Sequence, residues 1–587
     1  MAEHIEDIKN PATTEVVGSK ASKIDSIVNN YSGKDVEDFV AKFVEMSNDA
    51  QANDAHEKSM TLREGIATFP KAAFWSVVLS TAIIMEGFDT NLLASLYNQT
   101  SFQIHYGRYY PDLGEYQIPA KWQTSLSMAV NVGEIIGLWL AGITAERYGY
   151  RPTLIVSMML AIGFIFIIFY SVSIEMLLVG ELLCGVVWGA FQTLTVSYAS
   201  EVCPVVLRVY LTTYVNACWV IGQLISSCVL KGTLSMDTQW AYKIPWALQW
   251  IWPIPIIIGV YFAPESPWWL CKKGRLHEAR TSIRRLLSKN KNLPDVDVLA
   301  DAMLSKMQLT ITHEKQQMTG SSYWDCFRGV NLRRTRVASM IWVLQNITGS
   351  ALMGYSTYFY TQAGLDQGMS FTFSIIQYAL GLIGTLLSWI LSQKYGRFTI
   401  FFGGMLINFI ILIIVGSLGC ANSSGASWGI GSLLLVFTFV YDSTVGPITY
   451  CVVAEIPSAQ VRSKTVAVAR NFYNLAGIPV AVITPYMLNP TAWNWKAKTG
   501  FFWAGFSLFG LIWTWFEFPE TKGRTYAELD VLFKNGVKAR EFKTTEVETF
   551  NTEEMLANMD DNHLKQVVLE KEEEEKVEMM EDARFKT

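Results

Sequence analysis

Twelve long apolar segments, separated by polar ones, dominate the pattern of this chain. They fall at 72–97, 122–144, 152–171, 174–198, 209–230, 246–263, 337–360, 371–392, 399–418, 428–452, 465–488 and 499–518. Because about 20 apolar residues in a helix span a bilayer, each segment predicts one transmembrane helix. We therefore expect an all-α membrane protein with twelve transmembrane helices.

A polar gap divides the twelve segments into two sets of six. We expect a six-helix bundle over 72–263, a second bundle over 337–518, and a central loop over 264–336 between them. Charges at helical spacing over 275–316 predict helices at the membrane surface inside that loop, with a disordered linker as the alternative. The remaining segments, 1–71 and 519–587, are polar tails, and the first is expected to be largely disordered.

Three charged motifs occur once in each half, in the same order. Glu201 and Arg208 return as Glu455 and Arg462, both 254 residues later. The other two pairs are Glu146-Arg147-Tyr148-Gly149 with Gln393-Lys394-Tyr395-Gly396, and Pro264-Glu265-Ser266 with Pro519-Glu520-Thr521. In an apolar chain, such a repeat indicates a transporter built from two duplicated bundles.

The distribution of basic residues predicts the orientation. An even number of spans puts both tails on one side. Loops on the opposite side carry six Lys or Arg residues, whereas tail-side loops carry 14 within 15 residues of a helix. Since cytoplasmic loops are enriched in Lys and Arg, both termini are expected in the cytosol.

Composition supports a membrane protein and offers no cofactor chemistry. The chain has 587 residues, of which 51% are hydrophobic and 17% charged, with a net charge of −5 that comes from the tails. Its eight cysteines show no metal or disulfide spacing, so we expect no metal and no cofactor. No nucleophile–base set or phosphate loop is present in the sequence, so an integral membrane enzyme is not expected.

The motifs together resemble those of the sugar porter branch of the major facilitator superfamily. Gly142 to Arg151 is similar to the family's motif between helices two and three, with Tyr150 in place of an arginine. Pro264 to Leu270 resembles the mid-chain signature, with Trp268 in place of an arginine, and Pro519 to Arg524 matches the C-terminal signature. The resemblance covers roughly residues 70–535 and implies the two-bundle fold of that superfamily.

Finer detail resembles the fungal α-glucoside, or maltose-type, permeases. The stretches that carry this likeness are Met85 to Thr90, Gln249 to Pro253, Pro267 to Leu270 and Trp493 to Lys496. The resemblance implies proton-coupled uptake of α-glucosides across a fungal plasma membrane. It does not identify the preferred sugar.

The paired motifs also predict a cytosolic gate. In the family, carboxylates and cations at the cytosolic helix ends form ion pairs that lock the outward-open state, and such pairs can be broken and remade for a few kcal/mol. The alternative is that these charges only mark helix interfaces. The residues assigned to this gate are Glu146, Arg147, Glu201, Arg208, Glu265, Glu455, Arg462 and Glu520.

Ionisable residues at membrane depth are costly and therefore indicate function. The candidates for proton coupling are Glu86, Asp89, Glu134, Glu181 and Arg470, with structural hydrogen bonding or snorkelling as the alternative. Asp89 aligns with the first-helix aspartate that carries the proton in the family. Glu181 replaces the family's fourth-helix arginine, so we expect Glu86, Asp89 and Glu134 to share a proton with Arg470 as counter-charge.

Sugar recognition requires amide, hydroxyl and aromatic side chains. Gln345 and Asn346 resemble the family's seventh-helix sugar site, Asn216 matches a fifth-helix binding residue, and Tyr450 stands for a tryptophan. The full set of candidates, each with helix packing as the alternative, is Asn216, Gln223, Gln345, Asn346, Tyr355, Gln377, Tyr450 and Asn474.

These observations favour a proton-coupled symporter for maltose-like α-glucosides that works by alternating access. A facilitative sugar carrier is the closest rival, and a non-transporting sugar sensor of the same fold is the second. The expected partners are a sugar, protons and the lipid bilayer, with no nucleic acid. We expect a functional monomer in the plasma membrane, with tail lysines available to ubiquitin and the endocytic machinery.

Overall fold

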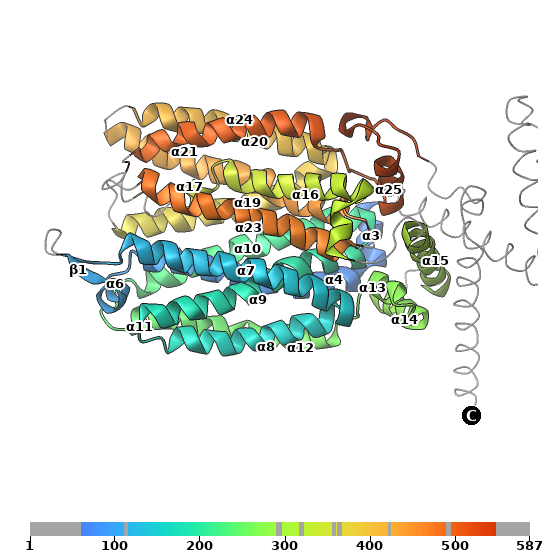
Figure 1. Cartoon of the computed structure of the whole chain (residues 1–587), viewed down its shortest axis with the longest axis horizontal. Coiled ribbons are helices and arrows are strands. Elements are labelled where there is room, and N and C mark those ends of the chain that lie inside the picture. The colour runs from blue at the N-terminus through green and yellow to red at the C-terminus, as the bar shows by residue number, and fades with distance from the viewer. Residues whose placement is uncertain are drawn as a thin grey trace, which may run out of the picture.

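The computed structural model describes residues 60–547 except 111–114, 289–295, 316–321, 355–359, 361–366, 421–423, 459–460, 489–492 and 494. The expectations for residues 1–59 and 548–587 lie outside this range. The described part is almost entirely helical, and its long helices run side by side along one axis (Figure 1).

The first half supplies six membrane spans. They are α4 (Pro70–Ser80) with α5 (Ala82–Leu96), α7 (Ala120–Tyr148), α8 (Tyr150–Phe169), α9 (Ile174–Val202), α10 (Val205–Thr233), and α11 (Trp240–Leu248) with η1 (Gln249–Ile251) and α12 (Pro253–Phe262). The sixth span begins before the predicted residue 246 and changes to a 3₁₀ turn just ahead of Pro253. Pro253 is the first residue of α12, a position where proline is tolerated because the first N–H groups of a helix have no partner within it.

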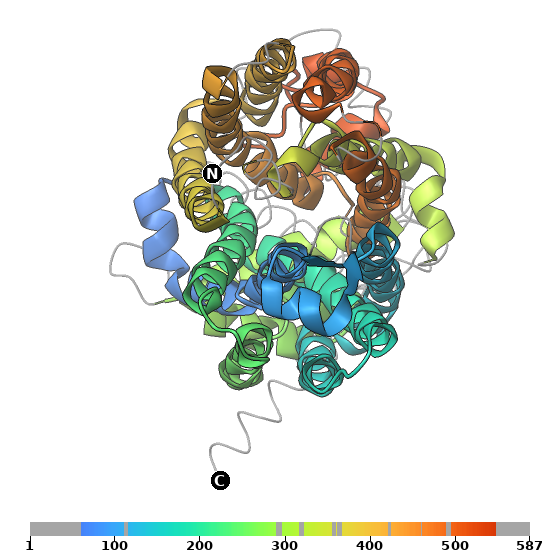
Figure 2. The ribbon, with the colours of Figure 1, turned by 90° about the vertical axis from the view of Figure 1, so that its left-hand side faces the viewer.

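The second half repeats this arrangement. Its spans are α16 (Gly329–Ile347) with α17 (Ala351–Gly354), α19 (Gln367–Lys394), α20 (Arg397–Leu418), α21 (Ser424–Ser443) with α22 (Val445–Glu455), α23 (Arg462–Leu488), and α24 (Thr499–Glu517). Figure 2 looks along the bundle and shows the two halves as separate groups of helices.

Eleven helices of the described chain are long and apolar enough to cross a membrane. The twelfth span is α16, which begins at Gly329, before the predicted start at residue 337. Its first turns carry Arg333, Arg334 and Arg336 and are therefore too polar to count as part of an apolar span. The prediction of an all-α, twelve-helix protein is confirmed.

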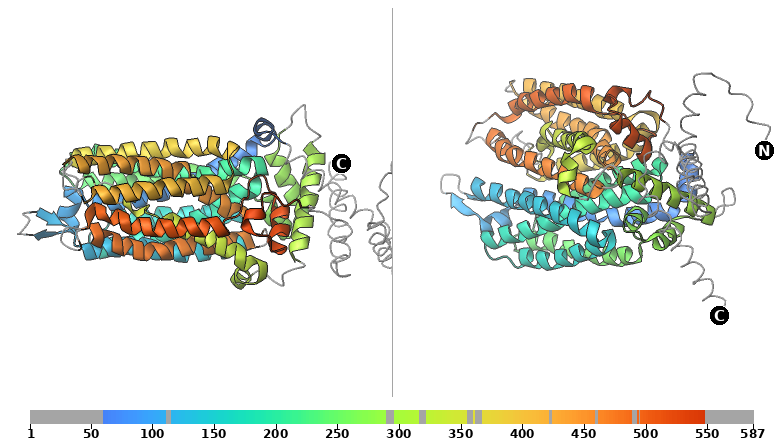
Figure 3. Two further views of the ribbon diagram at one scale, coloured as in Figure 1. Left: turned by 90° about the horizontal axis from the view of Figure 1, so that it is seen from above. Right: turned by 45° about the vertical axis from the view of Figure 1, so that its right-hand side comes forward.

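The two ends of the bundle differ. One end carries α6 (Thr100–Tyr106) and a hairpin of β1 (Arg108–Tyr110) and β2 (Glu115–Gln117), in which Arg108 lies opposite Gln117. We call this the hairpin end. The opposite, or tail, end carries α3 (Leu62–Thr68), α13 (Pro267–Lys272), α14 (Leu276–Leu286), α15 (Val296–Lys315), η2 (Tyr323–Phe327), α25 (Tyr526–Lys534) and η5 (Ala539–Glu541) (Figure 3). Helices therefore form within the predicted stretch 275–316.

Candidate functional site

A cavity of about 250 Å³ lies between the two halves, and side chains from both line it. Five of the predicted sugar-binding residues are in its wall, namely Asn216, Gln223, Gln345, Asn346 and Tyr450. Asn216 and Gln223 come from α10, Gln345 and Asn346 from α16, and Tyr450 from α22. The cavity thus brings together amide groups that lie more than 100 residues apart in the chain.

Hydrogen bonds hold these amides in position. Gln345 Nε2 donates to the carbonyl of Gly446 over 3.3 Å, and Asn346 Nδ2 donates to the carbonyl of Tyr473 over 3.1 Å. Asn216 Nδ2 donates to Asp442 Oδ1 over 3.4 Å, which joins the two halves at the cavity wall. Each amide oxygen can still accept, which suits a ligand rich in hydroxyl groups.

Two other predicted residues, both in the described part of the chain, do not line this cavity. Gln377 accepts from the hydroxyl of Tyr360 and donates to the carbonyl of Met353, so it ties α19 to α17. Asn474 is completely buried one helical turn from Arg470. Tyr355 lies outside the described residues.

Apart from Tyr450, sequence reasoning missed the aromatic residues of the wall, which are Trp219, Tyr378, Tyr441 and Tyr473. It also missed Asn131. Asn131 and Tyr473 each stand three residues from a charge already singled out, Glu134 and Arg470. Because residues at i and i+3 share a helix face, the spacing from these charged residues could have identified Asn131 and Tyr473 in the sequence.

A buried charge network borders the cavity and spans both halves. Arg470 Nη2 from α23 lies 3.7 Å from Glu86 Oε1 of α5. Gln192 of α9 bridges them, since its Nε2 donates to Glu86 over 2.7 Å and its Oε1 accepts from Arg470 Nε over 2.7 Å. The Arg470 guanidinium also packs over the rings of Trp342 and Tyr473, at 4.4 and 4.0 Å.

Glu134 belongs to the same network. Its side chain is 5% exposed and interacts electrostatically with Arg470. Arg470 of the second half therefore interacts with two carboxylates of the first half, through a close contact with Glu86 and electrostatically with Glu134. A buried arrangement of this kind is costly to break, because it leaves a charge without its partner.

Asp89 has a different environment. Its Oδ1 accepts from Gln249 Nε2 over 2.6 Å, and its Oδ2 accepts from Trp188 Nε1 over 3.0 Å. Glu181, fully buried, lies beside it. These partners all come from the first half. The buried carboxyl groups therefore form two sets: Asp89 with Glu181, and Glu86 with Glu134 near Arg470 of the second half.

Ion pairs join the two halves at the tail end. Arg462 Nη1 lies 3.4 Å from Glu201 Oε1, with both side chains almost fully buried. Lys464 pairs with Glu146 across the same interface. Lys464 was not predicted, although it stands two residues after the motif arginine.

Two other predicted carboxylates cap helix starts at matching places in the repeat. Glu265 accepts from the backbone N–H groups of Tyr150 and Arg151 at the start of α8. Glu520 accepts from those of Arg397 and Phe398 at the start of α20. Burial raises the pKa of Glu265, and the backbone N–H groups that it accepts from partly offset this.

The caps explain why a glycine stands at this place in both halves. Gly149 has φ of 96°, and a Cβ there would lie only 2.7 Å from Glu265 Oε2. A Cβ at Gly396 would overlap Glu520. Glycine is therefore required at both positions for the carboxylate to reach the helix start.

The two halves differ in how they neutralise the remaining carboxylates. In the second half, Glu455 accepts from Thr521 over 2.6 Å and from Arg397 over 3.3 Å. In the first half, Glu201 accepts from Ser266 and from the hydroxyl of Tyr150, the residue in the place of Arg397. Glu455 thus has a cation from its own half, whereas Glu201 takes Arg462 from the other half.

Tyr526 of α25 lies between the halves at this end. Its ring is 3.8 Å from the guanidinium carbons of both Arg208 and Arg462. Its hydroxyl approaches the carbonyls of Ser200 and Ala454, at 3.2 and 3.4 Å. Both pairs of contacts are related by the 254-residue repeat, so Tyr526 makes equivalent contacts with each half. The remaining gate candidate, Arg147, is exposed and packs on Tyr148.

Comparison with known proteins agrees with this architecture. Residues 75–533 match the family model described as "Sugar (and other) transporter". The fold resembles the major facilitator superfamily proton:xylose symporter XylE bound to 6-bromo-6-deoxy-D-glucose, with a TM-score of 0.68, 20% identity, and coverage of 79% of this chain and all of that one.

Two relatives from Saccharomyces cerevisiae are much closer in sequence. Maltose permease MAL31 is 44% identical over 528 residues, which is 89% of this chain and 85% of the relative. General alpha-glucoside permease is 46% identical over 507 residues, which is 86% of this chain and 82% of the relative. The predicted resemblance to the sugar porters and to the α-glucoside permeases is confirmed.

Proposed function

The chain belongs to the sugar transporter family, and we propose that it imports α-glucosides such as maltose together with protons, by alternating access, across the plasma membrane. Membership of this family makes it a transporter rather than an enzyme. The names of its yeast relatives and the amide-lined cavity support an oligosaccharide as cargo. In this proposal the tail end faces the cytosol, in accord with its basic loops.

The observation that carries proton coupling is the contact between Glu86 and Arg470, of which Arg470 lines the cavity. At this separation and an effective dielectric constant of about 20, two unit charges attract by roughly 4 kcal/mol. A proton on Glu86 removes that attraction between the halves. Arg470 is then free to donate to a sugar hydroxyl in the cavity that it lines.

Asp89 and Glu181 form the second protonatable site in this proposal. Two carboxyl groups buried side by side cannot both carry a full charge without a cation between them, so they share a proton. Asp89 remains the candidate carrier, held by Gln249 and Trp188. Glu86 and Glu134 connect the proton to Arg470 and hence to the sugar.

Alternation opens the tail end by breaking the pairs Glu201–Arg462 and Glu146–Lys464. Ion pairs of a few kcal/mol suit this purpose, because they hold one state and still allow exchange. Opening also withdraws Tyr526 from at least one of the two arginines that it contacts.

Counterflow of labelled maltose in proteoliposomes, with simultaneous recording of pH, tests this function. A symporter gives sugar exchange and sugar-driven proton movement. Exchange without proton movement would show a facilitative carrier. Specific sugar binding with neither would show a sensor.

A further inference from the structure

A hydrogen bond between the two halves lies on the hairpin side of the central cavity. The hydroxyl of Tyr378, on α19 of the second half, donates to Oδ1 of Asn91, on α5 of the first half, over 3.0 Å. Tyr378 lines the cavity, and Asn91 lies near Leu96, where α5 ends and the chain passes to α6 at the hairpin end. The mechanism proposed above gives this bond no role.

Further contacts fix the place of this bond in the interface between the halves. Nearer the hairpin end, Lys231 Nζ of α10 donates to Thr372 Oγ1 of α19. On the tail side, Trp389 Nε1 of α19 donates to Thr213 Oγ1 of α10 over 2.9 Å. Helices α10 and α19 thus meet along their length, and α5 reaches across to α19 at the level of Tyr378.

The amide of Asn91 is held so that its oxygen faces Tyr378. Its Nδ2 donates to the carbonyl of Gln223 over 3.2 Å and to Ser227 Oγ over 3.0 Å, both on α10. These two bonds use both N–H groups of the amide. Asn91 and Tyr378 are 7% and 4% exposed, so separating them leaves a buried oxygen and a buried hydroxyl without partners unless water or a ligand replaces the bond.

Tyr378 can contact the sugar and Asn91 at the same time. A phenolic hydroxyl donates one hydrogen bond and can also accept. The hydroxyl that donates to Asn91 can therefore accept from a sugar hydroxyl in the cavity that Tyr378 lines. Hydrogen bonds in such a chain strengthen one another in a protein interior. A sugar in the cavity thus favours the bond that joins the halves.

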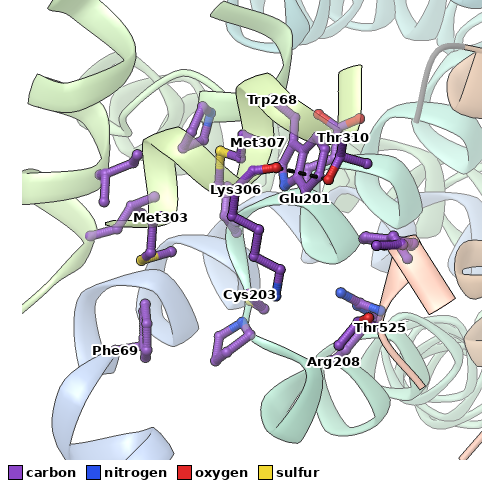
Figure 4. Close-up of a pocket in the computed structure, with 17 residues that line it drawn as sticks. Phe69, Glu201, Cys203, Arg208, Trp268, Met303, Lys306, Met307, Thr310 and Thr525 are labelled. Carbon is purple, nitrogen blue, oxygen red and sulfur yellow. Dashed lines mark hydrogen bonds between the residues drawn. The ribbon is translucent and has the colours of Figure 1, made fainter. Parts of the chain in front are cut away.

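The two sides of the cavity are joined by different chemistry. At the tail end, Glu201 pairs with Arg462, and Figure 4 shows Glu201 and Arg208 in the wall of a small cavity there. Tyr378 and Asn91 are both neutral, and a neutral hydrogen bond is weaker than one between charged groups. The hairpin side can therefore open while the tail end stays joined.

We propose that Tyr378 is a positioning residue for transport, which responds to sugar in the central cavity by closing the hairpin side through Asn91. The bond breaks when the hairpin side opens to admit the sugar, and it forms again once the sugar meets the Tyr378 hydroxyl. Asn91 passes this movement to α5, the helix that also carries Glu86 and Asp89. The response to sugar rests on the proposed function, whereas the joining of the halves by this bond does not.

Two native cysteines serve as probes of the hairpin end in the purified full-length protein. Cys228, on α10, and Cys420, just after α20, are exposed, whereas the other six cysteines are buried. One exposed cysteine is in each half, and both are near the hairpin end. Spin labels on their thiols, measured by pulsed dipolar electron paramagnetic resonance, therefore report the separation of the halves at this end.

Tyr378→Phe removes the hydroxyl and keeps the ring. Without sugar, we expect this variant to show longer distances between the labels than the unaltered protein, because the open hairpin side is favoured. Tyr360→Phe is the matched control, since the Tyr360 hydroxyl donates to Gln377 Oε1 over 3.1 Å within the second half, and it should keep the original distances. Unchanged distances in Tyr378→Phe, or an equal change in Tyr360→Phe, would overturn the proposal.

A second variant shows whether the two residues act together. Asn91→Leu should lengthen the distances as Tyr378→Phe does, and the double variant should lengthen them no further. Additive changes would show that the two residues act separately and would contradict the proposal. If Asn91→Leu does not fold, Tyr378→Phe and its control decide.

Maltose tests the response to sugar. At a saturating concentration, the unaltered protein should shift toward shorter distances, whereas Tyr378→Phe should bind labelled maltose and shift far less. An equal shift in both proteins, or none in an unaltered protein that binds maltose, would overturn the response to sugar. If maltose does not bind at all, the proposed function fails, while the sugar-free comparison still decides whether the bond joins the halves.

Discussion

Glu86 and Arg470 lie 3.7 Å apart although 384 residues of sequence and the boundary between the two halves separate them. Gln192 joins them through two hydrogen bonds of 2.7 Å. Arg470 lines the cavity that carries the amide side chains. In the mechanism proposed above, a proton and a sugar therefore act on the same guanidinium.

Asp89→Asn should leave sugar exchange intact and abolish sugar-driven proton movement. The amide keeps an oxygen for Trp188, and Gln249 can turn its own oxygen toward the new N–H₂, but an amide carries no exchangeable charge. Counterflow and pH recording in the same vesicles measure both quantities. Asp301→Asn, at a half-exposed surface pair with Arg280, is the matched control and should change neither. Undiminished proton movement in Asp89→Asn would remove Asp89 from the pathway.

Gln345→Ala should weaken sugar binding by about tenfold, the equivalent of about 1.4 kcal/mol, because a cavity amide is lost. Gln377→Ala is the matched control, since Gln377 is not among the residues that line the cavity and its amide bonds to Tyr360 and to the backbone carbonyl of Met353. Equilibrium binding of labelled maltose measures both. A larger loss for Gln377→Ala than for Gln345→Ala would place the sugar elsewhere.

The pair between Glu146 and Lys464 can be tested by exchange of its charges. Lys464→Glu alone should reduce the transport rate, because two carboxylates then face each other where the halves meet. The double variant Glu146→Lys with Lys464→Glu should recover most of the rate, since the attraction is restored. A double variant no faster than the single one would show that this contact does not support the gate.

Tyr150→Arg should make the first half resemble the second. Arg397 supplies Glu455 with a cation from its own half, and the new arginine would do the same for Glu201. We expect Arg462→Gln to slow transport and Tyr150→Arg to restore part of the rate in that background. Tyr150→Phe in the same background removes the hydroxyl without adding charge and should restore nothing.

The sequence predicted the helices and the chemistry of single positions well. Apolar length located the spans, and the 254-residue repeat located Glu201 and Arg462, which the structure joins. Membrane-depth charges pointed to Glu86 and Arg470, which also meet. These signals depend on burial cost or on periodicity, and both are visible in one sequence.

The sequence could not show which of these residues meet one another. Asp89 was grouped with Glu86 and Glu134, but its hydrogen-bond partners Trp188 and Gln249 come from helices whose packing no local pattern records. Gln377 looked like a sugar ligand because a buried amide has the same appearance whether it faces a cavity or a neighbouring helix. Tyr526, on a short helix after the last span, carries no charge or motif that marks it as a contact of both halves.

The central claim is that the contact between Glu86 and Arg470 couples the proton to the sugar. Glu86→Gln tests it most directly, measured by maltose counterflow and pH in the same proteoliposomes. The account predicts that counterflow persists while sugar-driven proton movement and accumulation against a gradient are lost. Proton movement at the unaltered ratio to sugar in Glu86→Gln would contradict it.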